Sequence, residues 1–506
     1  MSVHDLICGA TGSGKSEAEL VQLKREALSG KTSIILADPH GTLAEEFLIH
    51  LAECHLLHRV IYDKLSETDL VPIYDWLTPS TEKDELQRES ENYLRMHKFM
   101  QLLIRQGGLQ TTQGRPIINK GLEDALKLYL YQDKPVPITW LRELYTPNSG
   151  VAAYMVAHCT DEDTRRQFER YSNFNAQTLN YHTGPADTRL RELLGTPSLR
   201  ARTGEPSFDN DEFLEKKGIL ILSGKDCDPD AASVMMSAMT LKAYDFCRRK
   251  QTHPVLVVLE EAVNARLVGP QEVQMLAEVR KWGMRFRILV QAINFPDIEL
   301  RKGILQNTEH TWFYQSDPES AALAAADVAT RIVDPLKVHH TETRTRNADD
   351  GFEMIENTSH GKSKDKHGHT ISKTSNTSHS VVRKTREVTE VINRYMSLSD
   401  QVTLAQQKLM KQQPGWRWYS GDLGPHYEPM EKHLWHHLSG ILSGPLSEQA
   451  IARLKDAKLQ KAIARVKESP VYRKPSLTPI PSNPEPPTQA KRKGAAARNE
   501  EGRGTK

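Results

Sequence analysis

The chain has 506 residues, with 67 Lys and Arg against 65 Asp and Glu and a hydrophobic share of 38%. That length predicts one enlarged domain or two domains with tails. The balanced charge gives no overall signal for nucleic acid, so any basic surface must be local. The 5 cysteines are scattered without CxxC or CxxH spacing, which argues against a zinc site or a disulfide framework and favours the cytoplasm. No stretch reaches the ~18 to 20 apolar residues of a membrane span, so work at a membrane would require a partner protein.

Residues 1–79 alternate short apolar runs with helical segments. Strands are expected at Val3–Cys8, Ser33–Ala37 and Val60–Tyr62, with a helix from Gly14 to Leu28. Short β-branched runs separated by helices are typical of a parallel sheet that helices cover on both faces. We therefore predict the first part of an α/β core here.

Residues 80–215 are polar and helical, as in Tyr93–Arg105 and Leu122–Tyr131, and contain no comparable apolar strand. The strand pattern resumes in 216–335, at Gly218–Leu222, Val255–Leu259, Arg285–Val290 and Thr311–Tyr314. The simplest account is one α/β sheet interrupted by an all-α insertion.

The last part of the chain is more polar. Residues 336–390 are rich in Thr, Ser, Asn, Lys and His, which predicts a mobile loop or an extended hairpin. Residues 391–468 are expected to hold a strand with Trp416 and Trp418 on one face and a helix over 446–466. Residues 469–506 contain seven prolines and a basic cluster, which predicts a disordered basic tail.

A phosphate-binding motif opens the chain. It matches GxxxxGK[S/T] and comprises Gly9, Ala10, Thr11, Gly12, Ser13, Gly14, Lys15 and Ser16. Glycines let backbone N–H groups surround a phosphate, and the following helix directs its positive end at the anion. Lys15 would contact the β- and γ-phosphates, and the Ser16 hydroxyl would bind Mg²⁺. With a strand before it and a helix after it, the motif predicts an ATP–Mg²⁺ site.

Two adjacent carboxylates end the expected strand Val255–Leu259. A buried strand carries such residues to the carboxyl edge of the sheet, where phosphates bind in α/β folds. Glu260 would hold Mg²⁺, and Glu261 would activate the attacking water. The alternative is a core strand that ends in ordinary surface acids, but beside the phosphate-binding motif we favour the catalytic interpretation.

Several further motifs, in order and at fitting spacing across about residues 3 to 316, resemble the HerA–FtsK superfamily of P-loop ATPases. They are Gly9–Ser16, Asp38-Pro39-His40-Gly41, Val60–Asp63 with Pro72–Leu77, Arg280-Lys281-Trp282-Gly283, Ile288–Gln291 and Leu305–Thr308. The superfamily includes DNA-end-processing translocases, conjugative coupling proteins, secretion ATPases and viral packaging ATPases. The resemblance implies a RecA-like P-loop NTPase fold that works as a DNA motor, in a homo-oligomer that we expect to be a hexameric ring.

The resemblance also assigns roles to single residues. Gln291 would be a sensor that touches the γ-phosphate or the attacking water. Asp38 would be catalytic, with a capping role in the turn as an equal alternative. Arg280 would complete the neighbouring subunit's site, with pairing to an acid such as Glu278 as the alternative and Arg285 and Arg287 as rivals.

This sequence departs from the superfamily at Glu260, where Asp is usual. Two other functions therefore stay open. One is an ATPase that moves or assembles protein in a secretion machine. The other is a nucleotide-gated scaffold that partners a nuclease in defence.

Overall fold

The computed structural model describes residues 4–315 apart from gaps at 78, 81–83, 107–114, 135, 147–148, 252 and 293–296, single residues between 318 and 329, and then 338–364, 368, 370–395, 398–410, 416–420, 426–429 and 445–475. The chain divides into two compact units. The first combines Met1–Ala324 with Lys408–Lys506, and the second is Ala325–Gln407.

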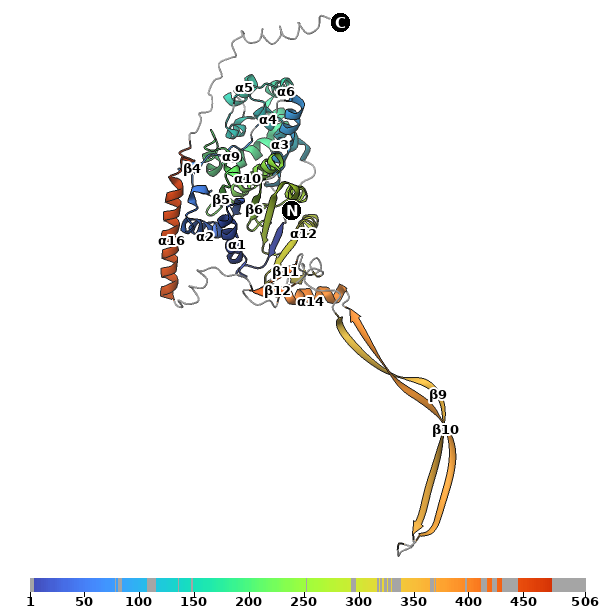
Figure 1. Ribbon diagram of the computed structural model, residues 1–506. Helices are drawn as coiled ribbons and strands as arrows, with labels where there is room; N and C mark the ends of the chain where they lie inside the picture. Colours follow the sequence, from blue (N-terminus) through green and yellow to red (C-terminus); the bar gives the residue numbers. More distant parts are fainter. Residues whose placement is uncertain are drawn as a thin grey trace. The chain divides into compact units, whose positions relative to one another are not determined.

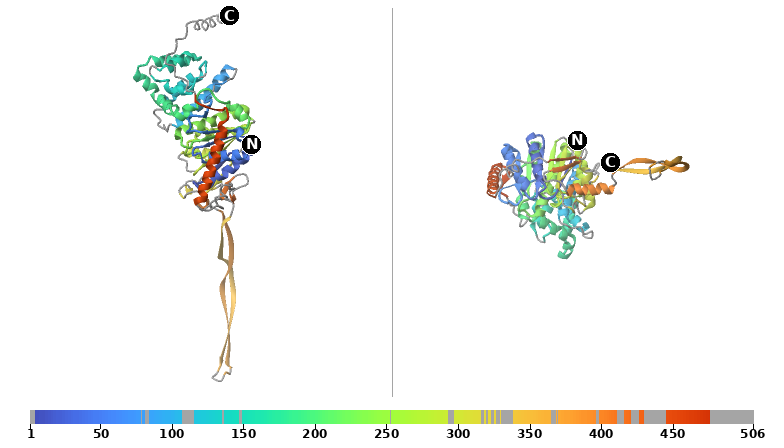
Figure 2. Two further views of the ribbon diagram at one scale, coloured as in Figure 1. Left: turned by 90° about the vertical axis from the view of Figure 1, so that its left-hand side faces the viewer. Right: turned by 90° about the horizontal axis from the view of Figure 1, so that it is seen from below.

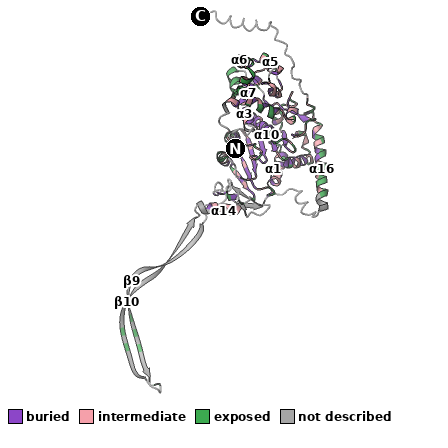
Figure 3. Cartoon of the chain, turned by 180° about the vertical axis from the view of Figure 1, so that it is seen from behind, coloured by how far each residue is buried: buried purple, intermediate pink, exposed green. Residues whose placement is uncertain are grey.

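The core of the first unit is a sheet whose described strands run in the order β12-β11-β8-β1-β7-β6-β2-β5-β3 (Figure 1). Their bounds are β1 Asp5–Cys8, β2 Ser33–Asp38, β3 Val60–Lys64, β5 Ile219–Ser223, β6 Val255–Leu259, β7 Met284–Val290, β8 His310–Phe313, β11 Trp416–Ser420 and β12 His426–Pro429. The strands from β8 to β3 are parallel, whereas β11 and β12 add antiparallel strands beside β8. Every residue of β2, β5 and β6 is buried, as parallel strands covered on both faces require (Figure 3). The predicted α/β sheet is confirmed.

Two groups of helices cover the sheet. One group is α1 Lys15–Ser29, α2 Thr42–Glu53 and α16 Pro445–Lys467, which pack on one another and on β2, β5 and β3 (Figure 2). The other is α10 Pro229–Lys250, α11 Pro270–Val279 and α12 Ile298–Asn307, which contact β2, β6 and β7. α10 buries most of its length, because α3 of the insertion packs on its outer side.

Between β4 and β5 the described chain is helical, in agreement with the predicted all-α insertion. The elements are α3 Glu85–Gln106, α4 Arg115–Leu130, η2 Ile138–Glu143, α5 Gly150–Ala157, α6 Glu162–Ser172, α7 Ala176–Leu194, α8 Pro197–Ala201 and α9 Asn210–Glu215. Gly121 lets α4 approach α7 closely, since a Cβ there would lie 2.6 Å from the Ala186 Cβ. None of the described helices is both long and apolar enough to cross a membrane.

The chain after Val466 differs from the predicted tail. Residues 469–475 are ordered, and β13 Tyr472–Arg473 pairs with β4 Val71–Pro72. The buried Tyr472 hydroxyl accepts a hydrogen bond from the Tyr62 N–H at 2.7 Å and donates one to the Tyr62 carbonyl at 2.8 Å. Burial of a large aromatic ring with a satisfied hydroxyl outweighs the flanking prolines. The rest of the predicted tail, 476–506, lies outside the described residues.

The second unit contains a long antiparallel hairpin of β9 Val338–Lys364 and β10 Thr370–Tyr395, followed by α14 Leu398–Met410. The register is continuous from Thr370↔Lys364 to Tyr395↔Val338 with three irregularities. Strand β10 therefore runs past the boundary at 390 that the sequence suggested.

Candidate functional site

Four segments with predicted site residues meet at one edge of the sheet. β1, β7, β6 and β2 are neighbours in that order and run parallel. The segments that follow them begin with Gly9, Gln291, Glu260 and, at the end of β2 itself, Asp38. Because parallel strands end at the same edge, the topology alone assembles these groups, and the carboxyl edge is where α/β folds bind ligands.

The loop after β1 has the backbone that a phosphate cradle needs. Gly12 and Gly14 have φ of 77° and 93°, a conformation that L side chains rarely adopt. Gly9 passes so close to β8 that a Cβ would lie 2.4 Å from the Tyr314 Cβ. The Ala10 N–H donates to the Gln315 carbonyl at 2.8 Å, which ties the loop to the chain after β8. Lys15 begins α1 with only 5% of its surface exposed, so its charge lies inside the loop.

Ser16 and Glu260 lie side by side, as a metal site would require. The Ser16 hydroxyl donates to Glu260 Oε1 at 2.7 Å, while the buried Oε2 has no hydrogen-bond partner within the described chain. Burial raises the pKa of Glu260 to about 7, although the Ser16 hydrogen bond and the Lys15 charge oppose the shift. A buried carboxylate with an unused oxygen beside a hydroxyl is a donor set of the kind that Mg²⁺ prefers. The longer Glu side chain therefore fits the role usually taken by Asp.

Glu261 is held by two amides. Gln291 Nε2 donates to Glu261 Oε1 at 2.8 Å, and Asn264 Nδ2 donates to Oε2 at 3.1 Å. The Glu261 side chain is buried, and its backbone has φ of 51°. A carboxylate fixed in this way next to the phosphate loop is suited to accept a proton from water.

Asp38 uses its carboxylate within its own turn. Oδ1 accepts from the His40 N–H and Oδ2 from the Ala44 N–H, both at 2.9 Å. Burial nevertheless raises the pKa of Asp38 above its usual range. These bonds satisfy the start of α2, so Asp38 has the capping role. A catalytic role for Asp38 stays a prediction.

Arg280 lies at the opposite edge of the sheet from Lys15, because it precedes β7 whereas the site follows β1 and β6. It pairs with Glu309, not with Glu278, which instead binds Tyr244 at 2.6 Å. Of the two rival arginines, Arg287 is buried between Asp5 and Glu19, at 3.0 and 3.1 Å.

The other rival, Arg285, pairs with Glu26 at 2.8 Å. That places it against the P-loop helix of its own chain. Arg280 is therefore the most accessible of the three.

Sequence reasoning missed two contributors to the site. Asn264 holds Glu261, and Tyr314 packs against Gly9. Asn264 is three residues after Glu261, a spacing at which a turn returns a side chain to its own start. Nothing in the sequence pointed to Tyr314, since its contact joins residues about 300 positions apart.

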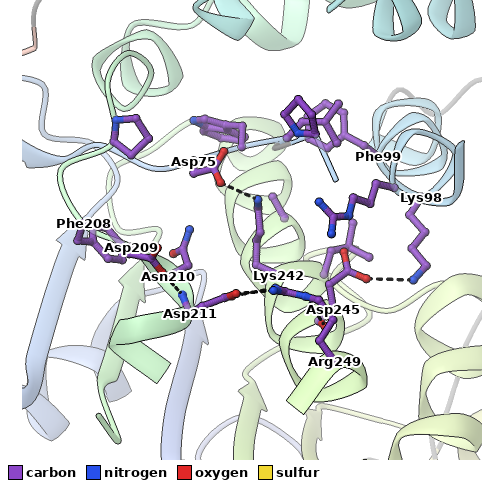
Figure 4. A pocket seen from close by; sticks show the side chains of 17 residues that line it. Asp75, Lys98, Phe99, Phe208, Asp209, Asn210, Asp211, Lys242, Asp245 and Arg249 are labelled. Carbon is purple, nitrogen blue, oxygen red and sulfur yellow. Dashed lines mark hydrogen bonds and ion pairs between the residues drawn. The ribbon is translucent and has the colours of Figure 1, made fainter. Parts of the chain in front are cut away.

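A cavity of about 550 Å³ lies elsewhere, between α3, α10 and the loop before α9 (Figure 4). Its basic side chains are matched by acids, as in Lys242 with Asp75 at 3.3 Å and Lys98 with Asp245 at 3.4 Å. No residue of the P-loop edge lines it. The cavity is therefore separate from the candidate nucleotide site.

No protein-family model and no curated protein sequence matches the chain. Three solved structures are similar to it. One is the unbound bacterial conjugative coupling protein TrwB, at 12% identity and TM-score 0.49, covering 85% of this chain and 84% of that chain. TrwB in complex with ADP and Mg²⁺ gives 11%, 0.49, 85% and 86% in the same order, and VirB4 of Thermoanaerobacter pseudethanolicus gives 12%, 0.47, 86% and 90%.

The strand order, the loop after β1 and the two carboxylates after β6 are properties of this chain itself. They are the phosphate-binding and metal-binding elements of P-loop enzymes, in their usual places on the sheet. The chain therefore has the fold of a P-loop nucleoside triphosphatase.

Proposed function

We propose that this chain is an ATPase of the HerA–FtsK type that works as a ring and moves or processes DNA. The observation that carries the ATPase part is the convergence of Lys15, Ser16, Glu260, Glu261 and Gln291 at one sheet edge. The DNA part rests on the order of the sequence motifs. The buried Ser16–Glu260 pair supports ATP with Mg²⁺ as the fuel.

Each residue has one task in this proposal. The glycine-rich loop and Lys15 bind the β- and γ-phosphates. Ser16 and Glu260 hold Mg²⁺, which when bound would neutralise charge on the phosphates. Glu261 accepts the proton of the attacking water, and Gln291 has a second amide hydrogen to direct at the γ-phosphate while it holds Glu261.

DNA stimulation tests the proposed substrate. We expect hydrolysis by the full chain to rise several-fold with double- or single-stranded DNA, because a motor releases product faster when it is engaged with its track. The measurement is steady-state phosphate release with each DNA and with heparin as a polyanion control. Hydrolysis that no DNA changes would favour a protein-moving ATPase. Partner binding that survives in a Lys15→Ala variant would favour a scaffold, for example one that partners a nuclease.

We further propose that Arg280 acts on the neighbouring subunit of a hexamer. It cannot reach the site of its own chain, because the two lie at opposite edges of the sheet. Its pairing with Glu309 would have to be exchanged for the neighbour's phosphate. Arginines supplied across an interface contribute ~10³ to 10⁵ in rate.

Subunit mixing tests this role. Rings of Arg280→Ala alone or Glu261→Gln alone should be inactive. Mixed rings should recover part of the activity, because some interfaces join an intact Glu261 to an intact Arg280. Phosphate release is measured across mixing ratios, with mass photometry to establish that mixed rings form. Fully active Arg280→Ala rings, or mixed rings with no recovery, would exclude Arg280.

A further inference from the structure

The turn after β6 is unusual in its backbone. Glu261 and Arg266 have φ of 51° and 54°, so two non-glycine residues of one short turn adopt the left-handed conformation. Such residues cost of order 1–3 kcal/mol each and persist where surrounding contacts fix them. Here the Ala262 N–H donates to the Leu289 carbonyl at 3.0 Å, and the Leu267 N–H donates to the Ala262 carbonyl at 2.7 Å. The turn is thereby fixed to β7, the strand that carries Gln291.

The carboxylate of Glu261 is held from two directions. Gln291 reaches Oε1 from the end of β7, and Asn264 reaches Oε2 from within the turn. The terminal torsion of a Glu side chain is broad, so one hydrogen bond on one oxygen leaves the carboxylate plane free to rotate. A donor on each oxygen fixes the plane. Asn264 therefore supplies a constraint that Gln291 alone cannot.

Asn264 is itself exposed, whereas Glu261 is buried with 6% of its surface accessible. An exposed asparagine contributes little packing, so its amide is not needed to complete a core. What it contacts is the group assigned to water activation. The geometry favours a role in orienting that group over a role in stability.

We propose that Asn264 is a positioning residue, which sets the carboxylate of Glu261 toward the attacking water. The inference rests on the proposed ATPase function. Loss of the Asn264 amide frees Oε2, and the carboxylate then rotates away from the water for part of the time. Misplacement of a reacting group by about 1 Å costs up to ~10²-fold in rate. Nucleotide binding uses Lys15 and the loop, and does not depend on this contact.

The test compares Asn264→Ala and Asn264→Asp with wild type in the full chain. Asn173→Ala is the matched control, since Asn173 is also exposed and donates one hydrogen bond, to the Glu169 carbonyl at 3.0 Å in α6. We expect Asn264→Ala to lower kcat by about tenfold or more without changing KM for ATP or Tm. The control should match wild type in all three.

Asn264→Asp adds a readout that a structural role would not move. At neutral pH the introduced carboxylate repels Glu261, so kcat should fall below that of Asn264→Ala. As the pH falls, the introduced carboxyl takes up a proton and can donate to Oε2 again. The ratio of this variant's kcat to that of Asn264→Ala should therefore rise from pH 8 to pH 5.5.

The outcomes separate the two claims. If wild type hydrolyses ATP and Glu261→Gln does not, but both Asn264 variants match wild type, only the role of Asn264 is overturned. An increase in kcat for Asn264→Ala, or a constant ratio of the two variants across pH, also overturns it. Absence of ATP hydrolysis by wild type, or full activity of Glu261→Gln, overturns the proposed function of the site and this role with it.

Discussion

Lys15→Ala and Glu261→Gln should both abolish ATP turnover, but through different steps. Lys15 is buried in the phosphate loop, so its removal should lower nucleotide affinity. Glu261→Gln keeps the shape of the side chain and removes only the group that accepts a proton. It should bind ATP as wild type does and lower kcat by ~10² to 10⁴, the usual contribution of a general base.

Binding of a fluorescent ATP analogue, measured beside phosphate release, separates these two effects. Glu169→Gln is the matched control, because Glu169 is an exposed acid of α6 far along the chain from the site. It should leave both quantities unchanged. Wild-type turnover by Glu261→Gln would show that another residue activates the water.

Asp63→Asn should destabilise the first unit more than any surface substitution. Asp63 accepts from the Arg202 guanidinium at 2.6 and 2.8 Å, and both side chains are at most 1% exposed. Arg202 also donates to the carbonyls of Lys64, Glu67 and Ser198, so it cannot move to water when its partner charge is lost. Removing one member of a buried pair costs about 3–5 kcal/mol.

Urea denaturation followed by circular dichroism measures this free energy of unfolding. The control is Asp211→Asn, which breaks a pair with Arg249 whose side chains are 34% and 37% exposed and which should change stability by about 1 kcal/mol or less. A second variant, Asp63→Leu with Arg202→Met, should recover part of the loss, since apolar replacement removes both buried charges. Equal effects of Asp63→Asn and Asp211→Asn would contradict the prediction.

The sheet and the phosphate loop could be predicted because their signals are local. The run Val255–Leu259 matches β6 residue for residue, and Ser33–Ala37 and Arg285–Val290 each miss one residue of their strands. Apolar β-branched runs and glycine spacing carry this information within a few residues. The strand order also follows once the carboxylates must meet the loop.

Contacts between distant parts of the chain could not be predicted. Asp63 and Arg202 are 139 residues apart, and Tyr62 and Tyr472 are 410 apart. Neither Arg202 nor Tyr472 belongs to a motif, and the prolines around Tyr472 pointed to disorder. Asp38 shows the limit within a motif, because the same sequence suits a capping turn or a catalytic group and only the hydrogen bonds of the carboxylate distinguish them.

The position of β1 has a consequence for how the protein is made. β1 is the first strand of the chain, yet it lies between β7 and β8, which end at Val290 and Phe313. A ribosome that adds about 5–20 residues per second needs roughly 15–60 s to make both neighbours. Until then β1 has no strand to pair with, and the phosphate loop after it has no Tyr314 to pack against. The nucleotide site, although encoded first, is among the last parts to form, so a nascent chain shorter than about 310 residues should be unable to bind ATP.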